Sequence, residues 1–229
     1  ARIFYTQLRA EELLGNQQDH FETLQDKICC RLVNPQRYDK LQDAVHMPYL
    51  DLAVIFYPDF DISGADFRSY CVLRNNCLQD WNITVKDLFD IARKNTLKKD
   101  PFKIETPDEV LRKILPDDMV IRNLLEMFFP SDENFFRITC PDGDFGTTAL
   151  LYPELFENIA EKMQCDLSLV LLSENQMMVE PLEDLINKQC VLQDMYHASD
   201  DIMSDKIYCY RRNTGQISVY LNYNTLFSK

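Results

Sequence analysis

Glycine is scarce in this chain, with only five copies among 229 residues. Glycine-rich phosphate loops and flexible linkers both depend on that residue, so the sequence argues against either. The glycine patterns of nucleotide-binding P-loops and dinucleotide-binding folds are also absent. Hydrophobic residues nevertheless make up 46% of the chain and aromatic residues 11%, which predicts a folded protein with a real core.

Long apolar runs and paired cysteine motifs are missing as well. No apolar stretch approaches the length of about 18 residues that a membrane span needs, and we see no signal peptide. The eight cysteines form no CxxC pair and most lie in apolar runs, so we expect free, buried thiols in a reducing, cytoplasmic compartment. The sequence begins at Ala1, and a processed or truncated piece of a longer protein is therefore among our expectations.

Basic residues are in the minority: 24 Lys and Arg stand against 37 Asp and Glu, a formal net charge of −13. Most of this imbalance lies in residues 101–229, where 11 basic and 22 acidic residues give a net charge of −11. A region this acidic repels phosphate backbones, which argues against nucleic acid as a ligand. It predicts attraction to cations or to a basic partner protein, and solubility alone is the competing reading.

The first hundred residues contain alternating helix and strand signals. Four apolar residues spaced three or four apart predict a helix over residues 19–34: Phe21, Leu24, Ile28 and Leu32. The nearly continuous apolar run over residues 49–57 predicts a strand covered on both faces, and residues 65–74 are its predicted hairpin partner. A cap at Asn82 or Thr84 predicts a further helix.

The rest of the chain reads as short elements divided by turn residues. Thr106, followed by Pro107 and Glu109, has the pattern of a capped helix start. The later elements are predicted in this order: strands over residues 135–140 and 147–152, a helix from Pro153, a hairpin over 166–173 and 176–180, a helix from Pro181 to about residue 193, and a hairpin over 206–211 and 216–221.

These signals predict an α+β fold, with a mainly antiparallel sheet built from β-hairpins interspersed with amphipathic helices. We predict one domain over residues 1–229. A hinge or sub-domain boundary is expected near residues 98–107, where Lys98-Lys99-Asp100-Pro101 ends a helix. Edge strands are expected in this architecture, but nothing in the sequence sets the oligomeric state.

The order of several segments resembles an uncharacterised bacterial family of gut anaerobes that is known only as a domain of unknown function. The segments that carry the resemblance lie at residues 31–34, 50–57, 72–75, 149–153 and 169–173, within a similarity over roughly residues 20–220. The resemblance implies the fold and a bacterial cytosolic origin, and it implies no activity. Family members tend to carry Ser-Ser-Ile-His where this chain reads Leu172-Ser173-Glu174-Asn175, so no role of such a His is carried over.

Histidines are few, and none of the three belongs to a zinc-binding motif. We therefore predict no metal site and no cofactor. Candidates for a catalytic site assembled from distant segments are His46, Asp51 and His197, with Asp200 and Asp201 close to the last of them in sequence. The competing readings are a packing role at a strand entrance for His46 and a solvated polar loop for His197.

Two short motifs have a functional reading beside a structural one. Cys29-Cys30, predicted inside the first helix, lies near Lys27 and Arg31, which would lower the pKa of a thiol. Buried, unreactive thiols are the other reading. The acidic segment Asp142–Gly146 suggests calcium but lacks the closing Glu of an EF-hand loop, so a hairpin turn explains it better.

Three further features have the same two readings. The helix after Pro153 carries carboxylates on one face, which could hold metals but fit a solvated face better: Glu154, Glu157 and Glu161. Trp81 would line a pocket or plug the core. Lys98-Lys99 with Lys103 forms a basic patch too small to predict nucleic-acid binding.

Three functional hypotheses remain. The first is a non-enzymatic interaction or regulatory protein that docks a basic partner through its acidic second half. The second is an enzyme with a dispersed site that leaves no local motif. The third is a lobe of a larger assembly.

Overall fold

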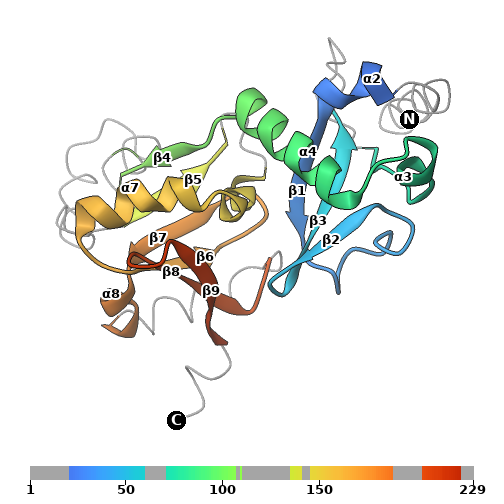
Figure 1. The fold of residues 1–229 in the computed structure, drawn as a ribbon. Helices are drawn as coiled ribbons and strands as arrows, with labels where there is room; N and C mark the ends of the chain where they lie inside the picture. The colour runs from blue at the N-terminus through green and yellow to red at the C-terminus, as the bar shows by residue number, and fades with distance from the viewer. Residues whose placement is uncertain are drawn as a thin grey trace, which may run out of the picture. The chain divides into compact units, whose positions relative to one another are not determined.

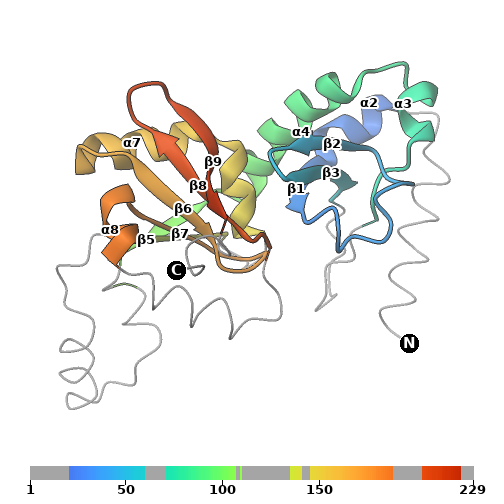
Figure 2. The same ribbon diagram turned by 90° about the horizontal axis from the view of Figure 1, so that it is seen from below.

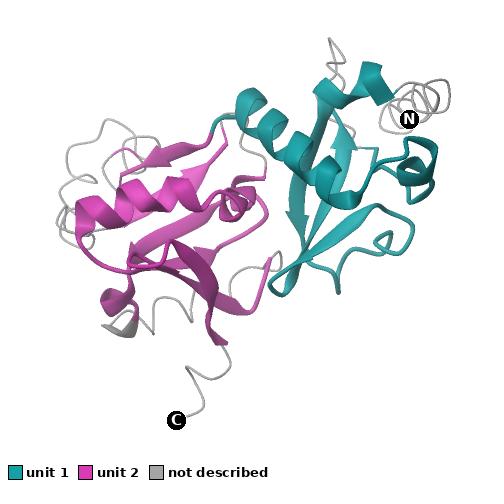
Figure 3. Ribbon diagram, in the orientation of Figure 1, with its two compact units in different colours: residues 1–101 teal, residues 102–229 magenta. Residues whose placement is uncertain are grey.

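The computed structural model describes residues 21–59, 71–106, 109, 135–140, 145–187 and 203–222. The chain divides into two compact units, residues 1–101 and residues 102–229 (Figure 3). Each unit has its own antiparallel sheet together with helices, so the predicted α+β class is confirmed.

A three-stranded antiparallel sheet of order β1-β3-β2 forms the first unit (Figure 1). The strands are β1 (Ile28–Val33), β2 (His46–Tyr49) and β3 (Leu52–Pro58). Every side chain of the central strand β3 is buried. The run over residues 49–57 was predicted as one strand covered on both faces. It instead divides at a turn into β2 and β3, and the coverage of both faces is confirmed for β3.

Helix α4 (Val85–Lys99) packs against β1 of this sheet. Thr84 is its N-cap, and the backbone N–H of Asp87 donates to the Thr84 hydroxyl while the Asp87 carboxylate accepts from the Thr84 backbone N–H. The predicted cap is therefore confirmed at Thr84. The remaining short elements of the unit are α2 (Phe21–Leu24), the 3-10 helix η1 (Gln25–Lys27) and α3 (Asn76–Asp80).

The helix predicted over residues 19–34 is wrong beyond its first turns. Residues 28–33 form strand β1, and five of its six side chains are buried. The helical spacing and a continuous run of apolar residues overlap here, since Ile28 and Leu32 fit both patterns. Pairing with β3 and packing against α4 stabilise the strand over the helix.

The hairpin predicted between residues 49–57 and 65–74 is also wrong in its described part. Strand β3 pairs with β1 on one side and β2 on the other, so both of its edges are occupied. Residues 71–73 are in no strand, and Arg74 makes an isolated bridge with Ala44. Residues 65–70 lie outside the described residues.

A six-stranded antiparallel sheet of order β4-β5-β7-β6-β8-β9 forms the second unit (Figures 1 and 2). The strands are β4 (Lys103–Glu105), β5 (Phe136–Thr139), β6 (Leu167–Leu171), β7 (Met177–Pro181), β8 (Lys206–Arg211) and β9 (Gln216–Asn222). The predicted hairpins that become β6–β7 and β8–β9 are confirmed, as is the strand at β5.

Two helices cover opposite faces of this sheet. The ring of Phe156 on α7 (Pro153–Met163) lies 5.9 Å from that of Tyr210, which pairs with Leu167 of β6. Leu185 of α8 (Leu182–Asn187) instead packs with Val170. Because successive residues of a strand face opposite sides, Leu167 and Val170 place α7 and α8 on different faces.

The helix start predicted at Pro153 is confirmed. The one predicted at Pro181 begins a residue later, because Pro181 ends β7, and its extension past residue 187 lies outside the described residues.

The strand predicted over residues 147–152 is wrong. Gly146–Leu151 form the buried 3-10 helix η2. A Cβ at Gly146 would lie 2.2 Å from the Asn175 carbonyl oxygen, so only glycine allows this close contact with the β6–β7 turn. The Thr147 hydroxyl also donates to the Glu174 carbonyl at 2.8 Å. These contacts from distant residues override the local β-propensity.

The helix start predicted at Thr106 has its capping box: the Thr106 backbone N–H donates to the Glu109 carboxylate at 2.9 Å. Hydrogen bonds with Thr106, that of the backbone N–H first, lower the pKa of Glu109. The turn predicted after Cys140 and the remainder of the helix after Glu109 lie outside the described residues.

Candidate functional site

Internal partners occupy the basic side chains of the second unit that the structure describes. Each described Lys or Arg of this unit is engaged within it: Lys103 and Arg137 with Glu105, Lys206 with Asp205, Arg211 with Asp166, Arg212 with Glu161, and Lys162 over the ring of Phe136. Four carboxylates thus balance most of the positive charge of these six side chains, and Lys162 contacts a ring instead.

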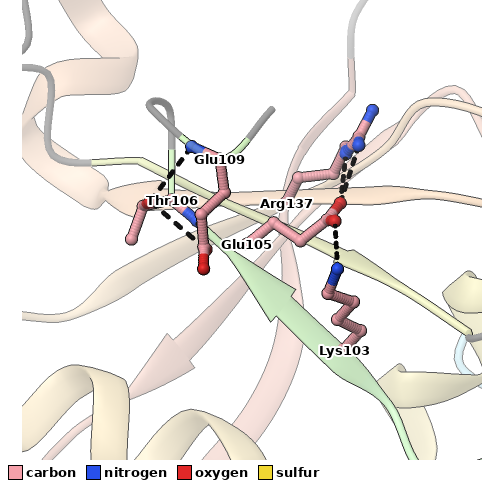
Figure 4. A network of polar contacts seen from close by, with 5 residues as sticks. All are labelled: Lys103, Glu105, Thr106, Glu109 and Arg137. Carbon is pink, nitrogen blue, oxygen red and sulfur yellow. Dashed lines mark hydrogen bonds and ion pairs between the residues drawn. The ribbon is translucent and has the colours of Figure 1, made fainter. Parts of the chain in front are cut away.

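Glu105 is the most deeply buried member of these pairs, with no exposed side-chain surface. Its register partner across β4 and β5 is Arg137, so the two side chains share one face of the sheet. Arg137 donates from Nε at 2.9 Å and Nη2 at 2.7 Å to Glu105 Oε2, while Lys103 Nζ lies 3.0 Å from Oε1 (Figure 4). Two cations thus compensate one buried carboxylate, which stabilises the attachment of β4 to β5.

A second group of ion pairs fixes the turn between β8 and β9. Arg211 Nη1 lies 2.7 Å from Asp166 Oδ2, and the backbone N–H of Arg212 donates to Asp166 Oδ1 at 2.9 Å. Partial burial acts to raise the pKa of Asp166, but the hydrogen bonds from both arginines outweigh it and lower that pKa. Arg212 also donates to Glu161 and so lowers the pKa of that carboxyl group.

Other carboxylates of this unit lie on the surface without such compensation. Among the described residues, Glu157, Glu183 and Asp184 form no ion pair; the two Glu side chains are exposed and Asp184 is half-buried. Their charges act on neighbours: burial first, then Glu157, raises the pKa of Tyr210, and burial first, then Glu183, raises that of Cys165. We call Glu157, Glu183 and Asp184 the acidic surface of the second unit.

Two of the three predicted catalytic candidates lie in the first unit, and the structure does not bring them together. His46 is the exposed first residue of β2, with Nδ1 2.9 Å from the Ala44 carbonyl oxygen. Asp51 is half-buried in the turn that follows the other end of β2. His197 lies outside the described residues. A catalytic role for these three residues stays a prediction.

Cys29 and Cys30 lie in strand β1, so the prediction that they sit inside a helix is wrong. Burial raises the pKa of Cys29 to about 11 and that of Cys30 to about 12, the opposite of activation by nearby basic residues. All seven described cysteines are free: Cys29, Cys30, Cys71, Cys77, Cys140, Cys165 and Cys209. The prediction of free thiols is confirmed for these seven. That of burial is confirmed for four of them and wrong for the half-buried Cys71, Cys77 and Cys165.

Trp81, the basic patch and the carboxylates of α7 have structural roles or lie in solvent. The ring of Trp81 lies 5.2 Å from that of Phe21 between centroids, at an interplanar angle of 37°. Lys99 forms an ion pair with buried Asp59, and Lys103 is engaged by Glu105, so little of the predicted basic patch remains. The three carboxylates predicted to form a solvated face on α7 are exposed: Glu154, Glu157 and Glu161.

In the described part of the chain, no group of three or more His, Cys, Asp or Glu side chains is placed to hold a metal ion. No helix within the same residues has both the length and the apolar character to cross a membrane. Asp142–Asp144, the acidic part of the segment that suggests calcium, lies outside the described residues.

Fold and surface define an α+β protein of two compact units, the second of which engages its described cations internally and exposes carboxylates. The chain belongs to a family of unknown function, DUF5688, whose family model matches residues 2–212. The predicted resemblance to a family of unknown function is thereby confirmed, while the bacterial origin it implied stays a prediction. No curated protein and no solved structure matches the chain.

Proposed function

We propose that this chain is a non-enzymatic interaction protein of the bacterial cytoplasm, and that its second unit binds a basic segment of a partner protein. The observation that carries the proposal is the division of charge within that unit. Its described cations are paired internally, whereas Glu157, Glu183 and Asp184 form no ion pair with described residues. Free thiols in the described residues support a reducing compartment.

Charge of this kind acts mainly on encounter and selectivity. The second unit carries a net charge of −11, against −2 for residues 1–100. A field of one sign attracts segments of the opposite sign and speeds their association, and it rejects partners of like sign. Because such attraction is screened over about 8 Å at physiological ionic strength, binding should weaken steeply as salt is added.

A titration with a defined probe tests the proposal. The probe is a ten-residue peptide in which Lys alternates with Val, added to the whole chain and followed by calorimetry. The test variant removes the acidic surface without adding charge of the other sign: Glu157→Gln, Glu183→Gln and Asp184→Asn together. The matched control removes three exposed carboxylates of the first unit: Asp39→Asn, Asp43→Asn and Asp90→Asn.

We expect affinity for the peptide to fall at least about tenfold between about 50 and 300 mM NaCl. The acidic-surface variant should bind at least about fivefold more weakly than the parent at low salt, and the control variant should bind as the parent does. Binding that ignores salt, or equal weakening in the two variants, would contradict the proposal. No binding at low salt would also contradict it.

A further inference from the structure

From the edges of the two sheets we infer that β9 is a docking edge, along which an extended basic segment of a partner protein adds as a seventh strand to the sheet of the second unit. The inference rests on the proposed function and names where and how the partner binds. An unpaired sheet edge presents a row of backbone N–H and C=O groups that an extended peptide can pair with.

Three of the four sheet edges carry devices that prevent such pairing. On the outer edge of β1, the Cys30 N–H donates to the Thr96 hydroxyl at 2.9 Å and the Asn95 amide donates to the Ile28 carbonyl at 2.8 Å. Helix α4 thus occupies those backbone groups. Strand β2 has only four residues, and one of them is Pro48.

Strand β4, the third edge, is shorter still and charged. It has three residues, two of which are Lys103 and Glu105. Short strands, proline and charged side chains are the usual means by which proteins prevent pairing at a sheet edge.

Strand β9 has none of these devices. It runs for seven residues, Gln216–Asn222, without a proline or a charged residue, in a chain that is 27% charged. In the part of the chain that the structure describes, no strand lies on its outer side, and Gln216 to Leu221 make no hydrogen bond beyond the ladder with β8. Val219 is 43% exposed. The edge is therefore long and neutral, and no described residue pairs with its outer side.

Acidic side chains lie on the helices that cover the two faces of this sheet. On one face, Glu157 of α7 acts on Tyr210, the register partner of Ile217 in β9. On the other face, α8 packs through Leu182 against the cluster that also holds Tyr220 of β9, and its next two residues are Glu183 and Asp184. Both helices therefore carry carboxylates that form no ion pair with described residues, whereas Arg211, which lies 5.8 Å from the centroid of the Tyr220 ring, is already paired with Asp166.

The same charge decides which occupant fits. A second copy of this chain could pair its own β9 in the same way, but it would bring a second unit with a net charge of −11 against the first. Like charges so placed repel and disfavour that dimer. A partner segment with Lys or Arg at alternate positions has the complementary charge and the extended shape.

Amide hydrogen exchange of the whole chain, with and without the Lys–Val peptide, tests the docking edge. Backbone groups of successive strand residues point to opposite sides, so one of Ser218 and Val219 directs its N–H toward β8 and the other outward. Ser218→Pro and Val219→Pro are made separately. The variant that keeps the parent's circular dichroism and melting temperature is the one whose N–H points outward.

We expect the peptide to slow exchange at alternate β9 amides at least about tenfold, and the folded proline variant to bind it at least about tenfold more weakly. Should both proline variants unfold, the exchange measurement on the parent alone decides.

Other outcomes overturn the inference in distinguishable ways. Salt-dependent binding with unchanged β9 exchange and an unaffected folded variant would leave the proposed function standing and refute the docking edge. No binding at low salt would refute both. Slow exchange at the outward-pointing β9 amides without peptide, together with a dimer in sedimentation, would show that a second copy is the occupant. It would refute the docking of a basic segment.

Discussion

Glu105 is a fully buried carboxylate whose charge is balanced by Arg137 and Lys103. Taking away one partner of a buried ion pair is costly because it leaves uncompensated charge. Arg137→Met should therefore lower the free energy of unfolding by about 3 kcal/mol, since the half-exposed Lys103 remains as a partial substitute. Urea unfolding monitored by fluorescence measures the loss.

Two further variants show whether that cost comes from the charge. The double variant Glu105→Leu with Arg137→Met removes both charges and should be more stable than Arg137→Met alone. Lys103→Met should cost no more than about 1 kcal/mol, as for a surface pair. A double variant less stable than Arg137→Met would contradict this account of the pair.

The cysteines of β1 provide a second residue-scale prediction. Burial raises the pKa of Cys29 to about 11 and that of Cys30 to about 12, so both stay protonated at pH 8 and lack solvent access. Iodoacetamide should leave them unmodified in the native chain while it labels the half-exposed Cys77 and Cys165 slowly. Peptide mapping by mass spectrometry follows each site, with labelling in urea as the control. Labelling of Cys29 as fast as that of Cys165 would contradict the structure.

The pairing of Glu105 with Arg137 shows what sequence could and could not indicate about the site. Arg137 is a lone charge in the otherwise apolar predicted strand over residues 135–140, which is a signal of an internal partner. Its partner lies 32 residues earlier, and only the pairing of β4 with β5 brings them together. His46 and Asp51, close in sequence, are separated by the length of β2 instead.

At the scale of elements, one hydroxyl joins α4 to the edge of β1. Thr96 accepts from the Cys30 N–H and donates to the Ala92 carbonyl at 2.8 Å, in a buried setting. Thr96→Val keeps the shape but leaves that N–H without its acceptor, so we expect a loss of about 1–3 kcal/mol in the free energy of unfolding. Thr96→Ser keeps the hydroxyl and is the matched control. Equal losses in the two variants would point to packing of the methyl group instead.

Gly146 is required because a side chain would not fit there, and Gly215 because of its backbone conformation. A Cβ at Gly146 would lie 2.2 Å from the Asn175 carbonyl oxygen. A Cβ at Gly215 would make only an ordinary contact, 3.8 Å from the Tyr210 hydroxyl, but Gly215 has a φ of +66°. Gly215→Ala should cost about 1 kcal/mol for its left-handed backbone. Gly146→Ala should cost at least about 3 kcal/mol, the upper range for overpacking, because two backbones must separate. Thermal and urea unfolding compare them, and the reverse order would contradict the packing of η2.

Elements defined by local signals were predictable, and elements defined by distant contacts were not. The β8–β9 hairpin follows from its turn residues, and α4 begins at its cap, Thr84. Strand β1 and helix η2 required knowledge of what packs on them, namely α4 and the β6–β7 turn. The position of β9 at a sheet edge depends on strand order, which no local pattern specifies.

At the scale of the whole molecule, charge is divided between two units. Residues 1–100 are nearly balanced, with a net charge of −2, and the rest carries −11. The division between units falls at residue 101, so the difference in charge coincides with a difference in structure. A binding surface that relies on charge should therefore belong to the second unit alone.

The most direct test of that claim is a chemical-shift map. The whole isotope-labelled chain is titrated with the Lys–Val peptide at low salt, and amide signals of both units are followed. We predict shifts at α7, α8 and β9 that reverse as salt is added, with the signals of residues 21–59 unchanged. Shifts confined to the first unit, or spread evenly over both units, would contradict the assignment of binding to the acidic second unit.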